Sequence, residues 1–177
     1  MRKTLAAAAA ALLATTISAS AQNLPPLTPE NTLLLELDCG VVTIQMLPDV
    51  APLHVERIST LANEGFYDGI VFHRVIEGFM AQTGDPTGTG RGGSPLPDLV
   101  AEFNANPFGR GAVGMARTND PNTANSQFFI TFAPANFLDG QYTLWGYVVD
   151  GMACVDTIER GEPPANPDRI ISMRTAG

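Results

Sequence analysis

Apolar and polar residues alternate along much of the chain, and this period of two predicts β-strands. In the segment 41–47, Val42, Ile44 and Met46 alternate with polar residues, which is the pattern of a half-buried strand. The apolar run 33–38 is separated from it only by Cys39 and Gly40, so the two segments are expected to form a hairpin. Further short strands are expected at 66–76, 79–83, 112–116, 126–132, 143–149 and 169–175.

Two segments follow the helical period instead. From 49 to 65 the apolar residues recur at the spacing of one helix face, with Asp49 as the expected cap, Pro52 in the first turn and Gly65 as the stop. A shorter helix is expected over 152–160, with Val155 and Ile158 facing inward. Many short strands, two separate helices and no repeated βαβ rhythm predict one antiparallel sheet, closed or sandwiched.

The first 21 residues show the pattern of a secretory signal peptide. Arg2 and Lys3 precede an apolar run over 5–17, and 19–21 is an Ala-Ser-Ala cleavage pattern. The run is shorter than the ~20 apolar residues of a membrane-spanning helix. Cleavage would leave an extended leader, 22–30, and one domain, 31–177, with no membrane association. The protein is therefore expected to be exported, to the periplasm in the first place, although the cell exterior stays open.

Charge and cysteine content narrow the classes of partner. The formal charge of −8 becomes −10 without Arg2 and Lys3, and nucleic-acid or anionic-membrane binding depends on basic patches. Neither partner is expected, and the domain is expected to be a monomer. An exported protein can join Cys39 to Cys154, but the sequence does not show how close they lie, so their pairing stays open.

Several kinds of chemistry find no support in the sequence. Residues 87–93 formally contain G-x-G-x-x-G, but two prolines follow at once and prevent the helix that a phosphate-binding turn needs. His54 and His73 lack metal-binding spacing, and no metal or cofactor is expected. His73 has no nucleophile or orienting acid at a recognisable spacing, and it alternates with Arg74, so a structural role is favoured.

The remaining polar groups lie in apolar segments. Arg74 is surrounded by apolar residues in 71–76 and has no acid within strand reach, unless it pairs with Glu77 or Glu56 at the surface. In 126–132, alternation places Gln127 and Phe129 on one face and an apolar core set on the other. The amide and the aromatic ring have the composition of a peptide-binding wall. Equally, Phe129 could simply cover the outside of the sheet, and both interpretations stay open.

Three long motifs resemble the signatures of a known family. FHRVIEGFMAQTGDPTGTGRGG (72–93), GMARTNDPNTANSQFFIT (114–131) and FLDGQYTLWGYVVDGM (137–152) are similar to the central motifs of cyclophilins, the cyclosporin-binding peptidyl-prolyl cis-trans isomerases. The resemblance spans about 31–175, and the signal peptide is typical of the exported bacterial branch. It implies a closed eight-stranded antiparallel β-barrel capped by two α-helices, with its site on the outside of the barrel. The implied substrates are unfolded or flexible polypeptides with X-Pro bonds.

Carried over motif by motif, the resemblance makes Arg74 the catalytic residue. It assigns substrate binding to Phe79, Met80, Gln82, Ala116, Arg117, Gln127, Phe129, Phe137, Leu138 and Tyr142. Three of these depart from the usual family residues. Arg117 replaces an asparagine that acts largely through its backbone, Tyr142 replaces a histidine, and Phe137 replaces a tryptophan, so only weak cyclosporin binding is expected. Trp145 matches a buried aromatic strand position instead.

Isomerisation explains why a nucleophile is not needed. Rotation about a peptide bond breaks resonance, at a barrier of ~18–20 kcal/mol, and no covalent bond is made or cut. An apolar pocket for proline and a guanidinium that donates to the prolyl nitrogen would favour the twisted state. The expected function is peptidyl-prolyl isomerisation in exported, folding proteins. The alternative is a proline-peptide-binding chaperone module with incidental catalysis, motivated by the open groove and by Arg117 in its peptide-lining segment.

Overall fold

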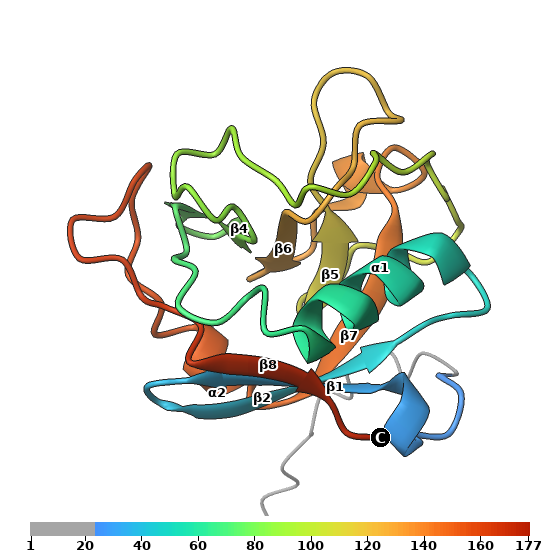
Figure 1. Cartoon of the computed structure of the whole chain (residues 1–177), viewed down its shortest axis with the longest axis horizontal. Coiled ribbons are helices and arrows are strands. Elements are labelled where there is room, and N and C mark those ends of the chain that lie inside the picture. Colours follow the sequence, from blue (N-terminus) through green and yellow to red (C-terminus); the bar gives the residue numbers. More distant parts are fainter. Residues whose placement is uncertain (1–23) are drawn as a thin grey trace, which may run out of the picture.

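A single antiparallel sheet of eight strands makes up most of the structure (Figure 1). The computed structural model describes residues 24–177, so the predicted signal peptide and the start of the leader lie outside the described residues. The strands are β1 Thr32–Leu37, β2 Gly40–Met46, β3 Arg74–Ile76, β4 Met80–Thr83, β5 Ala112–Met115, β6 Phe128–Thr131, β7 Leu144–Asp150 and β8 Ser172–Thr175. Their order is β3-β4-β6-β5-β7-β2-β1-β8. The mainly-β fold and the hairpin of β1 with β2 are confirmed.

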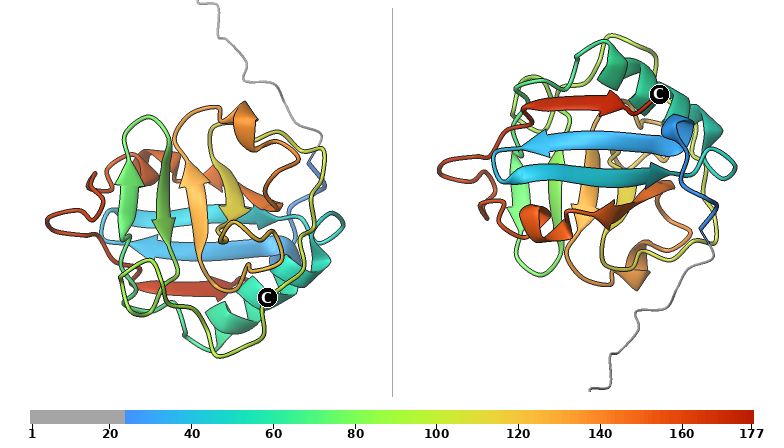
Figure 2. Two further views of the ribbon diagram at one scale, coloured as in Figure 1. Left: turned by 90° about the horizontal axis from the view of Figure 1, so that it is seen from above. Right: turned by 90° about the horizontal axis from the view of Figure 1, so that it is seen from below.

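The sheet curls until its two ends meet. Figure 2 shows the strands around β4 and β6 crossing over those around β1 and β2. The edge strands β3 and β8 do not pair with each other, but the segments that precede them do, at Val71 and Arg169. Phe72 donates to the carbonyl of Asp168 at 2.9 Å, and Ile170 donates to that of Ile70 at 2.9 Å. The sheet is therefore a strongly curled, open half-barrel whose two ends are linked, among the described residues, only by this isolated pairing, whereas a closed barrel was expected.

The inner face of the curled sheet holds the hydrophobic core. Side chains at alternate positions of β1 and β2, such as Leu33, Leu35 and Ile44, are fully buried, as the period of two predicts. Trp145 is also fully buried and packs edge-on against Phe128, with ring centroids 5.7 Å apart. Each such side chain contributes about 1.5–3 kcal/mol on burial. The expected buried position of Trp145 is confirmed.

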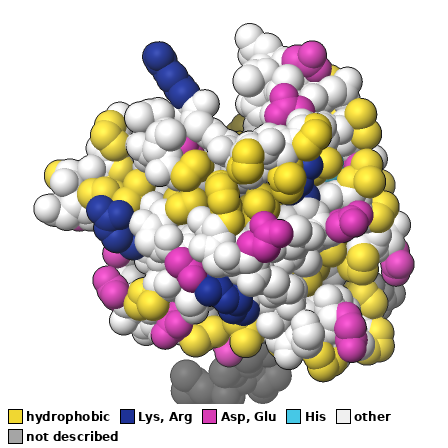
Figure 3. All heavy atoms as spheres, in the orientation of Figure 1, with side chains coloured by type: hydrophobic (Ala, Val, Ile, Leu, Met, Phe, Trp, Pro, Cys, Tyr) yellow, Lys and Arg dark blue, Asp and Glu magenta, His cyan; other side chains and the backbone are white. Residues whose placement is uncertain are grey.

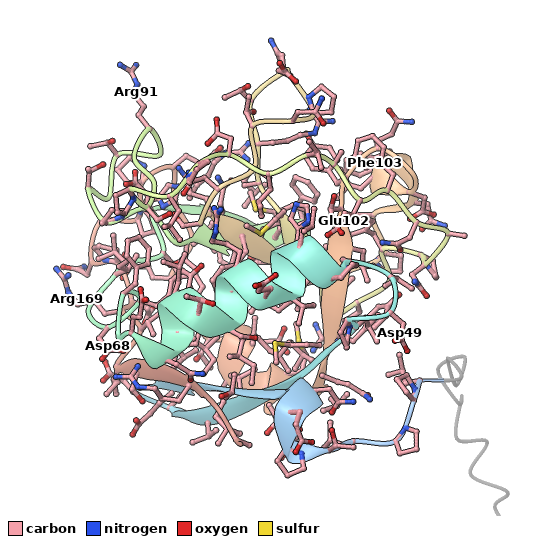
Figure 4. All side chains as sticks on the ribbon, turned by 45° about the vertical axis from the view of Figure 1, so that its right-hand side comes forward. Asp49, Asp68, Arg91, Glu102, Phe103 and Arg169 are labelled. Carbon is pink, nitrogen blue, oxygen red and sulfur yellow. A yellow bond between two sulfur atoms is a disulfide. The ribbon has the colours of Figure 1, made fainter. Side chains whose placement is uncertain are left out.

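The first helix, α1 (Pro52–Asn63), is shorter than expected and lacks the predicted Asp49 cap; its N-cap is Ala51. Glu102, 48 residues away from His54, takes the capping role (Figure 4). Its carboxylate accepts the backbone N–H groups of Leu53 and His54, each at 3.1 Å, and lies 2.6 Å from His54 Nδ1. The free N–H groups at a helix start need acceptors, and here a distant loop supplies them.

Two other expected elements are shorter than predicted. The second helix, α2, covers only Met152–Val155, because hydrogen bonds between residues three apart follow it, including Ile158 to Val155 at 3.2 Å, and these tighten the backbone into turns. Val155 and Ile158 are nevertheless buried. Of the predicted strand 66–76, only β3 forms, since Gly69 has a φ of 79° and breaks the extended run. Short 3-10 turns lie at Pro29–Asn31 and Asn136–Leu138.

A disulfide joins Cys39, in the turn between β1 and β2, to Cys154 in α2, with Cα atoms 5.6 Å apart. This distance is normal for a disulfide. The question that the sequence left open is thereby answered. Within residues 24–177, no helix is both long and apolar enough to cross a membrane.

Candidate active site

Strand register brings a cation, an amide and an aromatic ring into one row. Arg74 of β3 is opposite Gln82 of β4, and Gln82 is opposite Phe129 of β6. Directly paired residues point to the same face of a sheet, and this row is on the outer face. The neighbouring row, which includes Val75 and Ile130, points inward and is buried. The alternation predicted for 126–132 is therefore confirmed.

An apolar cluster lies next to this row on the outer face. Met80, Phe129 and Leu138 are among its buried members, each no more than 5% exposed. Phe79, Ala116 and Tyr142 are partly buried and pack against them. Phe129 thus takes part in a second apolar cluster, separate from the main core, and does not merely cover the outside of the sheet. Phe137 lies at the edge of this cluster, is 70% exposed, and has its ring 5.3 Å from that of Phe79.

Phe108 packs against the cluster through Phe129. The sequence did not predict it as a site residue. Its ring stacks on Phe129 with centroids 5.8 Å apart. Gly114, which is opposite Phe129 on β5, makes room for both rings, because an added Cβ would lie 2.6 Å from Phe108 and 2.7 Å from Phe129. Phe108 comes from an irregular segment without periodicity, so no local pattern indicates its position.

Arg74 has an acidic partner that no local sequence pattern predicts. Its Nε donates to Glu162 Oε1 at 2.8 Å, and its Nη1 donates to Gln82 Oε1 at 3.4 Å. The expectation of no nearby acid is therefore wrong, because the partner comes from a loop that is 88 residues away in sequence. The alternative pairing with Glu77 is also wrong, since Glu77 pairs with Arg160 at 2.6 Å.

The two site glutamines form a chain of hydrogen bonds in which each side-chain amide donates toward the glycine-rich loop. Gln82 Nε2 donates to Gln127 Oε1 at 2.9 Å, and Gln127 Nε2 donates to the carbonyls of Gly90 and Gly92 at 3.1 and 2.8 Å. The last acceptors are backbone carbonyls, which can only accept hydrogen bonds. Gln127 must therefore point its NH2 group at them and its oxygen at the NH2 group of Gln82. Gln82 therefore turns its oxygen toward Arg74.

Asp85 holds the glycine-rich loop 85–93 that supplies those carbonyls. It is only 1% exposed and accepts the backbone N–H groups of Thr87, Thr89 and Gly90 at 2.7, 3.0 and 2.6 Å. Burial alone would raise the pKa of Asp85, but hydrogen bonds from the Thr87 hydroxyl and from the backbone of Thr87, Gly92 and Gly90 lower it to about 2. The loop is therefore built around one buried carboxylate, which accepts hydrogen bonds from its backbone.

A cleft of about 520 Å³ opens between this loop and the segment 116–118. Figure 3 shows it as a hollow at the upper edge, between two loops that project upward. Arg117 lies on its far wall and donates to the carbonyls of Thr118 and Gln141, both at 2.8 Å. Its guanidinium also lies 4.3 Å above the ring of Tyr142. The structure therefore brings Arg117 and Tyr142 together with Ala116 at one rim.

Of the two histidines, His54 lies away from this row, whereas His73 lies beside Arg74 and Gln82 in a pocket that the loop 85–93 also lines. His73 is 6% exposed, and burial lowers its pKa, against an opposing effect of Asp85. His54 is fully buried beneath Glu102, and burial lowers its pKa as well. In the part of the chain from 24 onward, no cluster of three His, Cys, Asp or Glu side chains could hold a metal ion.

Comparison with known proteins identifies the family. The family described as cyclophilin type peptidyl-prolyl cis-trans isomerase/CLD matches residues 32–175. A probable peptidyl-prolyl cis-trans isomerase of Brucella suis is 50% identical over 182 residues, which cover 94% of this chain and 92% of the relative.

Two solved structures extend this finding to the fold. A cyclophilin from Hirschia baltica has a TM-score of 0.78 and 31% identity, over 84% of this chain and 75% of its own. A cyclophilin-type isomerase of Cryptosporidium parvum, crystallised in the presence of the dipeptide Ala-Pro, has a TM-score of 0.76 and 27% identity, over 81% and 98%. The chain belongs to the cyclophilin family and is a peptidyl-prolyl cis-trans isomerase.

Proposed function

We propose that this isomerase binds X-Pro segments on the outer face of its sheet and that Arg74 catalyses their rotation. The observation that supports this most directly is the row Arg74, Gln82 and Phe129 beside the apolar cluster. A proline ring bound against Phe129 and Met80 would lie within reach of the guanidinium. The Cryptosporidium relative was crystallised in the presence of the dipeptide Ala-Pro, which contains an X-Pro bond of the kind proposed to bind here.

The chemistry follows from the electronic structure of the amide. A planar amide is charge-separated and is stabilised by water, so an apolar pocket disfavours it. In the twisted state the prolyl nitrogen regains a lone pair and becomes a better hydrogen-bond acceptor. A donor that is aimed at that nitrogen therefore stabilises the transition state more than the ground state. Arginine suits this role because its guanidinium keeps its charge and can be held at one end while it donates at the other.

A protease-coupled isomerisation assay on an Ala-Pro peptide tests the role of Arg74. A hydrogen bond from a charged donor contributes about 1.5–3 kcal/mol, so Arg74→Ala should lower kcat/KM by about one to two orders of magnitude. Arg74→Lys keeps the positive charge but loses the planar guanidinium with its several N–H donors, so it should retain only part of the wild-type activity. Wild-type activity in Arg74→Ala would refute the proposed mechanism.

The same variant separates catalysis from chaperone-like binding. If the main function is isomerisation, Arg74→Ala should fail to accelerate the refolding of a client limited by proline isomerisation. Its suppression of client aggregation should fall in parallel. Equal suppression of aggregation by wild type and the inactive variant would instead favour the binding module, whose motivation is the open cleft lined by Arg117.

We also propose that the protein works outside the cytoplasm, in the periplasm, on exported chains that are still folding. The signal-peptide pattern of residues 1–21 and the disulfide between Cys39 and Cys154 both support export. Mass spectrometry of the protein recovered from cell fractions tests this. A mature N-terminus at Gln22 in the periplasmic fraction is expected, whereas an intact leader on cytoplasmic protein would contradict export.

A further inference from the structure

Glu162 reaches Arg74 because the loop between α2 and β8 extends the sheet by one pairing. Val75 and Gly161 exchange backbone hydrogen bonds in both directions, each at 2.8 Å. Gly161 is required there, since an added Cβ would lie 2.5 Å from Pro164 Cα. The next residue in the loop, Glu162, therefore lies alongside the residue that precedes Val75, which is Arg74. The outer edge of β3 is thus occupied at this point.

The loop is anchored without any help from the Glu162 carboxylate. Arg160 donates from Nε to Glu77 at 2.6 Å and from Nη1 to the carbonyl of Asp156 at 2.7 Å. Its guanidinium also lies 4.1 Å above the ring of Phe132. Together with the two Val75–Gly161 bonds, these contacts hold the backbone in place. The carboxylate of Glu162 can therefore be removed with little effect on the loop.

The ion pair between Arg74 and Glu162 contributes little to stability but defines an orientation. The two side chains are 44% and 54% exposed, and exposed pairs of this kind are worth about 0–1 kcal/mol. A guanidinium is planar and carries five N–H groups in a fixed fork. Glu162 holds it at Nε and Gln82 holds it at Nη1, while Nη2 donates to no group among the described residues. Two contacts at separate nitrogens fix the plane and leave donors for a ligand.

We propose that Glu162 is a positioning residue for the catalytic Arg74, an inference that rests on the role proposed for Arg74 above. Its carboxylate is the end point of the hydrogen-bond chain that runs through Arg74, Gln82 and Gln127 to the loop carbonyls. Each link of this chain pairs one donor with one acceptor. Without Glu162 the guanidinium is restrained from one side only, and the side chain spends less time directed at the prolyl nitrogen.

The test compares three variants, Glu162→Ala, Glu162→Gln and Asp68→Ala. Asp68→Ala is the matched control, because it removes the same charge from another exposed ion pair, with Arg174, whose two side chains contact neither Arg74 nor Arg160. Glu162→Ala should lower kcat/KM about fivefold, the effect expected for one exposed charged contact. Glu162→Gln keeps an acceptor oxygen and should retain more than half of the activity, while Asp68→Ala should match wild type.

Two further measurements distinguish positioning from a general structural role. Affinity for an Ala-Pro peptide should be unchanged in Glu162→Ala, because the affected contact strengthens only in the transition state. The nuclear magnetic resonance signal of the Arg74 Nε–H group should shift in Glu162→Ala and move back toward its wild-type position in Glu162→Gln. Full activity in Glu162→Ala, or peptide binding weakened in proportion to activity, would overturn the proposal.

Failure of this inference is distinguishable from failure of the proposed mechanism. If Arg74→Ala is impaired while Glu162→Ala is fully active, only the positioning role is wrong. If Arg74→Ala has wild-type activity, the mechanism itself is wrong, and the positioning role falls with it.

Discussion

At the scale of single residues, the side chains of the site differ in how firmly the protein holds them. Phe129 is buried between Phe108 and Tyr142, with ring centroids at 5.8 and 6.0 Å. Phe137, in contrast, is 70% exposed and touches the cluster through Phe79. A substitution at Phe137 should therefore change what the rim binds without disturbing the pocket.

This exposure leads to a prediction about cyclosporin. A tryptophan at this position, as is usual in the family, offers an indole N–H donor that phenylalanine lacks, and one hydrogen bond is worth about 0.5–1.5 kcal/mol. Wild type should be inhibited only weakly, and Phe137→Trp should tighten inhibition by up to about tenfold. Inhibition curves in the isomerisation assay provide the measurement. Nanomolar inhibition of wild type would contradict the prediction.

At the scale of elements, loops rather than strands complete the site. The glycine-rich loop 85–93 supplies the carbonyls that orient Gln127, and Asp85 organises this loop through backbone N–H groups. The segment around Gly161 delivers Glu162 to Arg74. Neither loop has a periodic pattern, so its course depends on individual hydrogen bonds.

The lowered pKa of Asp85 predicts a dependence of stability on pH. Its pKa is about 2 when folded, below the usual 3.8, so its ionised form stabilises the fold above pH ~4, and this contribution is lost as the pH falls toward 2. The contribution is about 2 kcal/mol. In urea titrations Asp85→Asn should lower the unfolding free energy at pH 7 by about this amount and should lose this part of the acid dependence.

The matched control for this prediction is Asp49→Asn, which makes the same change in an exposed turn before α1. It should follow the wild-type curve. An acid dependence that is the same in Asp85→Asn and wild type would show that the loop does not depend on this carboxylate.

At the scale of the whole molecule, one covalent bond ties together distant parts of the chain. The disulfide joins residues 115 apart, and it links the β1–β2 turn to α2. Neither of these elements contributes a residue to the candidate site. Acidic side chains are spread over the face in Figure 3 and do not gather into one patch. The contribution of the disulfide to the free energy of unfolding is therefore tested as the property of the whole molecule.

The double variant Cys39→Ser with Cys154→Ser should lower the unfolding free energy by about 2–4 kcal/mol, because an open chain gains more conformational entropy on unfolding. Its kcat/KM at 25 °C should equal that of wild type. Thermal unfolding with and without a reducing agent gives the measurement. The reducing agent should lower the Tm of wild type and leave the double variant unchanged, and a loss of activity in the folded double variant would contradict this separation.

The strand pattern and the outward face of the site can both be predicted from the order of the amino acids. A period of two places Gln127 and Phe129 on one side and Phe128 on the other wherever the strand lies, because side chains alternate along any extended backbone. The long motifs were also sufficient for the family. Helix bounds differ from the prediction. The start of α1 depends on Glu102 as an acceptor, and the local sequence does not reveal a partner so far along the chain.

Which distant groups meet is visible only in the folded chain. The pairing of Arg74 with Glu162, the support of Phe129 by Phe108 and the disulfide each join segments that no local pattern connects. Periodicity reports which side of an element is buried, but it carries no information about which other segment covers that side. Long-range contacts depend on how the whole sheet curls, and that is settled by the combined packing of all its strands.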